Sequence, residues 1–65
     1  MVTINGEAAA GAAGMTIGAY LAREGYDIAR VVVEQNLNIL PRQALETTVI
    51  QEGDSIEILC FVGGG

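Results

Sequence analysis

Hydrophobic and polar residues alternate at the start of the chain, which predicts a strand. Val2 and Ile4 alternate with polar neighbours, and Asn5-Gly6 follows at once. Asn and Gly both tolerate positive φ, so this pair predicts a tight hairpin turn. The returning segment, EAAAG, is poor strand material because alanine favours helices. We expect a short, weak edge strand there; a nascent helix is the alternative, although the glycines that follow disfavour it.

The stretch MTIGAYLAREGY has the periodicity of a helix. Ile17, Tyr20 and Leu21 fall at positions i, i+3 and i+4 and form one apolar stripe. Thr16 is the expected N-cap, and Gly25 is the expected C-terminal stop. This is the one long helix that the pattern predicts.

A β-branched run, RVVVEQN, predicts the next strand, with Val31 and Val33 on one face and Val32 on the other. Shorter elements follow. They are an extended NIL segment that ends before Pro41, a single helical turn in QALETT and a tight turn at EGD.

The last and longest predicted strand is SIEILCFV, residues 55–62. Two sets of residues alternate along it: Ile56, Ile58, Cys60 and Val62 on one side, Glu57, Leu59 and Phe61 on the other. If Ile56 and Ile58 face the helix, Leu59 and Phe61 point outward near the strand's end. Exposed apolar side chains there favour a docking patch. Coverage by the tail or by a neighbouring loop is the alternative, and the pattern alone weighs the two evenly.

The order of elements is therefore β-β-α-β-β-β, with one helix available to cover one sheet. This order predicts an α+β domain with a mixed sheet of four to five strands on one main helix, the β-grasp or ubiquitin-like roll. We place the domain at residues 1–62 and a flexible glycine tail at residues 63–65.

Composition supports one folded domain of 65 residues, since 51% hydrophobic residues are too many for a disordered acidic tail. No apolar run approaches the roughly 20 residues of a membrane span. Cys60 is the single cysteine and cannot form an internal disulfide, which fits a cytoplasmic location. It has no basic neighbour in its strand, so we expect a structural thiol rather than a reactive one.

The charge balance excludes several classes of function. Three arginines face eight acids, for a formal net charge of -5, so a nucleic-acid phosphate backbone would be repelled. The chain has no histidine and no lysine. Their absence removes the usual general base, the usual zinc ligand sets and Schiff-base chemistry. We therefore expect no catalytic residues, no bound metal or cofactor, and a protein that is not itself an enzyme.

Three features together carry a family resemblance: the opening INGE, the central VVVEQN and LPR segments, and the final EGDSIEILCFVGGG. In so short a chain they resemble the ThiS family, the sulfur-carrier proteins of thiamine biosynthesis. The sequence departs from the family at Leu37, where a glycine is common. Because a branched side chain resists positive φ, we expect a different type of turn there.

The resemblance implies a role for the glycine tail. In the family, a ubiquitin-activating-type adenylyltransferase uses Mg-ATP to adenylate the terminal glycine, here Gly65. Sulfur from a cysteine desulfurase system then converts it to a thiocarboxylate, from which thiazole synthase takes sulfur. The residues that would contact these partners are those at the end of the last strand and in the tail: Leu59, Phe61, Val62, Gly63 and Gly64.

Two other functions remain open. One is a sulfur carrier of another pathway, like the small subunit of molybdopterin synthase, although that subunit is usually longer and tends to carry a proline before its final glycines. The other is a ubiquitin-like modifier of other proteins. A glycine-rich end taken alone is more often a frayed terminus, and it is the resemblance that favours a reactive one.

Overall fold

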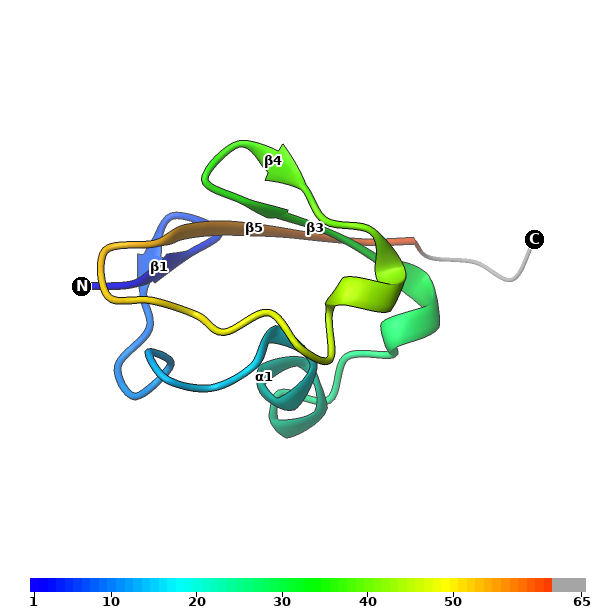
Figure 1. Ribbon diagram of the computed structural model, residues 1–65, viewed down its shortest axis with the longest axis horizontal. Coiled ribbons are helices and arrows are strands. Elements are labelled where there is room, and N and C mark those ends of the chain that lie inside the picture. Colours follow the sequence, from blue (N-terminus) through cyan, green and yellow to red (C-terminus); the bar gives the residue numbers. More distant parts are fainter. Residues whose placement is uncertain (62–65) are drawn as a thin grey trace.

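A five-stranded sheet curves over one short helix (Figure 1). In this computed structural model the described residues are 1–61. The strands and helices are β1 (Thr3–Ile4), β2 (Glu7–Ala8), α1 (Ile17–Arg23), the 3₁₀ turn η1 (Ile28–Arg30), β3 (Val31–Gln35), β4 (Asn38–Ile39), the 3₁₀ turn η2 (Arg42–Ala44) and β5 (Ser55–Cys60). The predicted order of elements and the α+β class are confirmed. The helical turn expected in QALETT lies slightly earlier, at Arg42–Ala44.

The sheet has the strand order β2-β1-β5-β3-β4, so the last described strand lies at its centre. β5 pairs in parallel with β1 and antiparallel with β3, and β2 and β4 form the two edges. The alanine-rich return strand is indeed short and at an edge, because alanine offers a sheet little side-chain packing.

One face of the sheet packs against α1, and its alternating apolar residues form the core. Ile56 and Ile58 of β5 and Val31 and Val33 of β3 are buried on this face, as predicted. The largest side chains that are fully buried are Ile17, Leu21, Leu45, Ile50, Ile56 and Val33. The other face of the sheet is not covered by the helix (Figure 1); we call it the open face.

The helix begins and ends where its sequence predicts. The Thr16 hydroxyl accepts a hydrogen bond from the Ala19 N–H at 3.1 Å. At the other end Gly25 has a φ of 83°, and its N–H donates to the carbonyl of Ala22 while that of Tyr26 donates to Leu21. This pair of bonds is the Schellman motif, which satisfies carbonyls that the helix leaves free.

The segment that follows η2 closes the helix side of the roll. The N–H groups of Ile17 and Gly18 donate to the carbonyls of Thr48 and Leu45, at 2.9 and 2.7 Å. Gly18 lies so close to this segment that a Cβ there would sit 3.3 Å from the Cα of Glu46. A glycine in the first turn of the helix therefore permits this close approach.

Both hairpins of the sheet turn through residues of positive φ. Asn5 and Gly6 have φ values of 52° and 83°, as the Asn-Gly signal predicts. Asn36 and Leu37 have φ values of 52° and 73°. The expectation of a different turn type at Leu37 was wrong: this leucine does adopt the positive φ that glycine would favour.

Candidate functional site

The end of β5 presents apolar side chains on the open face. Leu59 and Phe61 are 63% and 59% exposed, whereas Ile56 on the opposite face is fully buried. The predicted orientation of these residues is therefore correct, and no loop among residues 1–61 covers them. Coverage by the tail is a question that falls outside the described residues, as do the predicted contact residues Val62, Gly63 and Gly64 and the predicted reactive residue Gly65.

Hydrogen bonds fix β5 up to its last described residue. The N–H of Phe61 donates to the carbonyl of Arg30 at 2.8 Å, so pairing with the chain before β3 continues beyond Cys60. In Figure 1 this end of β5 lies at the opposite end of the molecule from the N-terminus. Leu59 thus lies near the end of β5, and Phe61 follows the strand with its backbone still paired.

A side chain from the first hairpin holds the middle of β5. The Asn5 carboxamide accepts a bond from the Ile58 N–H at 2.7 Å and donates to the Ile58 carbonyl at 3.3 Å. It thereby continues the parallel ladder one residue beyond the end of β1. The positive φ of Asn5 and these two bonds let one residue both turn the hairpin and anchor the central strand.

A buried carboxylate fixes the start of β5. Asp54 accepts hydrogen bonds from the Gln51 N–H at 2.9 Å and from the side chains of Gln35 and Asn36 at 2.8 and 2.9 Å. Burial acts to raise the pKa of the Asp54 carboxyl. The donated hydrogen bonds outweigh burial, so this pKa lies below its ordinary value. Asn36 also accepts a bond from the Ser55 N–H, which connects the second hairpin to β5.

The open face carries further residues that the sequence analysis did not select. Val32 of β3 lies directly opposite Leu59, and Ile39 of β4 lies opposite Glu34. Ile39 is largely exposed. These residues were missed because their proximity depends on strand register, for which a single sequence gives no signal beyond alternation.

Cys60 is exposed, so the expected structural thiol does not lie in the core. It pairs with Val31 at the end of the β3–β5 ladder, although Val31 itself is buried in the core. No other cysteine exists in the chain to pair with it.

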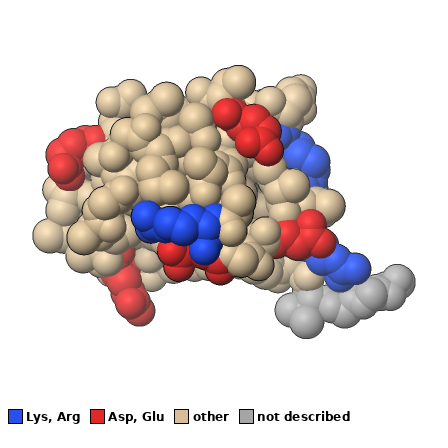
Figure 2. Space-filling model, turned by 90° about the horizontal axis from the view of Figure 1, so that it is seen from below, with Lys and Arg blue, Asp and Glu red and all other residues tan. Residues whose placement is uncertain are grey.

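The charged groups are scattered rather than collected into a basic surface. Figure 2 shows the face on the side of α1, where acidic groups lie around the edge and no continuous basic area is seen. Two arginines pair with local acids: Arg23 with Glu24 and Arg30 with Asp27. The guanidinium of Arg42 donates to the carbonyl of Ile28, which ties η2 to η1.

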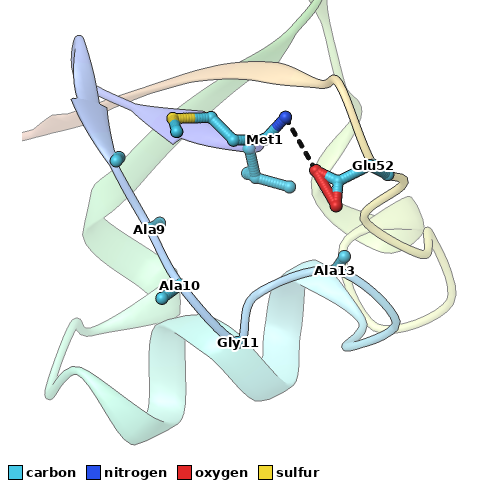
Figure 3. Close-up of a pocket in the computed structure, with 8 residues that line it drawn as sticks. Met1, Ala9, Ala10, Gly11, Ala13 and Glu52 are labelled. Carbon is cyan, nitrogen blue, oxygen red and sulfur yellow. Dashed lines mark ion pairs between the residues drawn. The ribbon is translucent and has the colours of Figure 1, made fainter.

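A pocket of about 150 Å³ lies beside the N-terminus (Figure 3). Small side chains of residues 8–13 form much of its wall, and the Met1 ammonium pairs with Glu52 at 2.9 Å. The hydrogen bond from this ammonium, together with its charge, lowers the pKa of Glu52. The pocket's carboxylate is thus already paired, and the pocket adds no reactive group to the site.

Among residues 1–61, no helix is long and apolar enough to cross a membrane.

Comparison with known proteins decides the family. The profile of the ThiS family matches residues 2–65, nearly the whole chain and including the glycine tail. The chain belongs to the ThiS family. This confirms the resemblance drawn from the INGE, LPR and FVGGG segments.

Solved structures of a ThiS-family protein have the same fold. The crystal structure of the thiamine biosynthesis protein ThiS from Geobacter metallireducens is 34% identical, with a TM-score of 0.75 over 98% of this chain and 97% of that one. Its solution structure gives the same identity and TM-score, with 86% of that chain covered. The β-grasp fold is therefore confirmed.

Two curated relatives are much longer than this chain. A thiazole synthase from Paramagnetospirillum magneticum is 41% identical over 64 residues, and one from Magnetococcus marinus is 36% identical. Each match spans 98% of this ThiS-family chain but only 20% of the relative. A domain like this one is thus a fifth of a longer protein named thiazole synthase.

Proposed function

We propose that this ThiS-family domain is a sulfur carrier for thiamine biosynthesis and that Gly65 is the residue that carries the sulfur. The observation that supports this most is the family match, which extends through the final glycines. The domain would serve as a protein co-substrate rather than an enzyme, because its chemistry is confined to one carboxyl group that is used and regenerated.

The proposed chemistry begins with activation of an unreactive group. A carboxylate is ionised at neutral pH and is a poor electrophile. A ubiquitin-activating-type adenylyltransferase would join the Gly65 carboxylate to AMP, using Mg-ATP and releasing pyrophosphate. A persulfide from a cysteine desulfurase system would then displace AMP and form an acyl disulfide. A thiol would reduce this disulfide and release the thiocarboxylate.

The two long relatives support thiazole synthase as the enzyme that receives the sulfur. Both are named thiazole synthase and contain a domain similar to this one. A carrier domain and its receiving enzyme in one polypeptide meet at high effective concentration, so joining them makes chemical sense. We propose that this chain delivers sulfur to the same class of enzyme.

Glycines suit the tail that this chemistry needs. Residues 63–65 can reach at most about 10 Å when extended, at roughly 3.3–3.6 Å per residue. Without Cβ atoms they can pass through a narrow channel and take any φ that an enzyme imposes. Ordering such a segment on binding has an entropic cost, so a docking surface beside it must supply affinity.

The exposed end of β5 is our candidate for that docking surface. Leu59 is in β5 and Phe61 directly follows it; both are exposed, and the backbone N–H of Phe61 is hydrogen-bonded to Arg30. Because the backbone that carries them is already paired, docking need not order this segment, and aromatic residues commonly dominate interface energies.

The decisive experiment is mass spectrometry of the protein co-expressed with the activating enzyme and the sulfur donor of its organism. We expect one oxygen of the Gly65 carboxyl to be replaced by sulfur. The matched control is a chain extended by one residue after Gly65, which should remain unmodified because its carboxylate is displaced from the reaction site. Absence of the sulfur species in the native protein would refute the proposal.

The docking role has its own test. Phe61→Ala should weaken binding to the activating enzyme by at least ~2 kcal/mol while leaving thermal unfolding nearly unchanged. Leu37→Ala is the matched control, since it removes another exposed apolar side chain at the far end of the sheet. Equal binding by both variants would place the docking surface elsewhere.

Cys60 is not needed in this scheme. Cys60→Ser should retain thiazole formation, because the sulfur resides on the terminal carboxyl and not on a side chain. A folded Cys60→Ser protein that forms the Gly65 thiocarboxylate but no thiazole would show that the exposed thiol takes part in transfer.

A further inference from the structure

Two glutamates are direct cross-strand neighbours on the open face of the sheet. Glu34 of β3 and Glu57 of β5 are direct cross-strand partners, and alternation places both on the side away from the buried Val33 and Ile58. Side chains in such positions have Cβ atoms about 4.5–5.5 Å apart, and like charges there destabilise a sheet. The β3–β5 ladder thus places two like charges at one cross-strand position.

The described part of the chain supplies no cation to neutralise this pair. The ion pairs among residues 1–61 use other acids, namely Glu24, Asp27 and Glu52. On the β4 side, the residue opposite Glu34 is Ile39, which is apolar. On the β1 side, Asn5 uses its side chain on the backbone of Ile58. The ion pairs found among residues 1–61 therefore involve neither Glu34 nor Glu57.

Apolar residues continue the same face toward the tail. Two residues along from the acidic pair, Val32 lies opposite Leu59, and Phe61 follows two residues beyond Leu59. At about 3.3–3.4 Å per residue, Glu57 lies roughly 13 Å from Phe61 along the strand. A partner that docks over Leu59 and Phe61 would therefore reach the two glutamates with the same surface.

We infer that Glu34 and Glu57 form an electrostatic contact for a lysine or arginine on the activating enzyme, placed beside the apolar surface that receives Leu59 and Phe61. A cation between the two carboxylates would reverse their repulsion, so the pair is unfavourable in the free domain and favourable in the complex. This inference rests on the proposed function, because it names the chemistry of the surface that the carrier meets. The charge pair adds to association rate and partner choice as well as to affinity.

The test is the double variant Glu34→Gln, Glu57→Gln, compared with Glu7→Gln, Glu46→Gln. Both double variants change the net charge equally, but the control pair lies off the open face and has no ion pair among the described residues. We expect the first variant to bind the activating enzyme on the order of tenfold more weakly, mainly through slower association, with a flatter salt dependence. Its melting temperature should be equal to or above that of the native protein, because the repulsion is gone.

Weaker binding together with undiminished stability is the result that a merely structural role cannot give. Equal binding by the two double variants would overturn the inference, and so would weaker binding that follows a lower melting temperature. Thiocarboxylate formation at saturating activating enzyme separates this inference from the proposed function. If the native protein forms the thiocarboxylate and the glutamates prove irrelevant to binding, only the inference fails.

Discussion

The two hairpin turns of this domain reach similar backbone conformations from different sequences. Asn5-Gly6 and Asn36-Leu37 all have positive φ, although glycine favours that conformation and leucine does not. The first turn agrees with the preference of its own two residues, although Asn5 also bonds to Ile58 of β5. The second is held by contacts outside it, because Asn36 bonds to Asp54 and to the backbone of Ser55. A turn can thus be dictated locally or imposed by the strand beside it.

Both turns serve the same strand. Asn5 bonds to the backbone of Ile58 in the middle of β5, and Asn36 bonds at its start. Since β5 carries Leu59 and leads to Phe61, the two asparagines fix the surface that we propose for docking. Substitutions in the two turns can separate the effect of a turn's own sequence from the effect of its hydrogen-bond partners.

The largest expected effect is on the imposed turn. Asp54→Ala removes the acceptor of three hydrogen bonds and leaves the Gln35 and Asn36 amides without this partner. We expect a loss of about 3 kcal/mol in the free energy of unfolding, since hydrogen bonds to charged groups contribute about 1.5–3 kcal/mol each and are not additive. Urea denaturation measures it, with exposed Glu7→Ala as the control; a loss below ~1 kcal/mol would mean that the turn holds without Asp54.

The next effect is on the local turn. Asn5→Ala loses both bonds to Ile58 and places a Cβ-bearing residue at a φ of 52°, so we expect destabilisation of about 2 kcal/mol. Asn5→Gly tolerates the positive φ but still lacks the bonds, and should lose about 1 kcal/mol. If the two variants are equally stable, backbone conformation contributes nothing at this position.

A smaller effect of opposite sign is expected at Leu37. Its side chain is 90% exposed and its φ is 73°, so Leu37→Gly removes strain without removing packing. Removing the strain should raise the free energy of unfolding by about 1–2 kcal/mol, but the greater conformational entropy of glycine in the unfolded chain offsets part of this. We therefore expect a net gain in stability of about 0.5–1 kcal/mol. Leu37→Ala retains the strained φ and should show no such gain in the same denaturation experiment.

The smallest effect concerns pH. The pKa of Asp54 is lowered in the folded domain, so its contribution to stability is complete above the unfolded value of about 3.9 and is lost as pH falls through the lower folded value. Denaturation curves from pH 7 to pH 2 should therefore show stability declining below about pH 4. Asp54→Asn should decline less steeply, and an identical decline would assign the acid sensitivity to other carboxyls.

The sequence predicted those features whose causes are local. Thr16 caps the helix, Gly25 ends it, and alternation along β5 correctly separates buried Ile56 from exposed Leu59. Capping, turn and burial preferences act within a few residues, so a single sequence displays them.

The features that were missed depend on contacts between distant residues. Leu37 takes positive φ because Asn36 is held by groups 18 and 19 residues away. The facing of Glu34 and Glu57 depends on strand register, and alternation alone cannot supply it. At Leu37, tertiary contacts override the local backbone preference of leucine. For Glu34 and Glu57, the strand register creates a pairing that local preferences cannot predict.

The central position of β5 has a consequence for how the chain folds. Its neighbour β1 lies more than 50 residues earlier in the sequence, with Thr3 paired to Ser55. The edge of β3 that pairs with β5 also stays unpaired until β5 is present. Such distant pairing raises contact order and slows folding, because a long loop must close before the contacts form. During synthesis, all other strands emerge before either inner edge of the sheet can be paired. A polypeptide interrupted before residue 55 leaves the inner edges of β1 and β3 unpaired, in addition to the outer edges of β2 and β4. The sheet therefore closes only after the strand that precedes the glycines has been made.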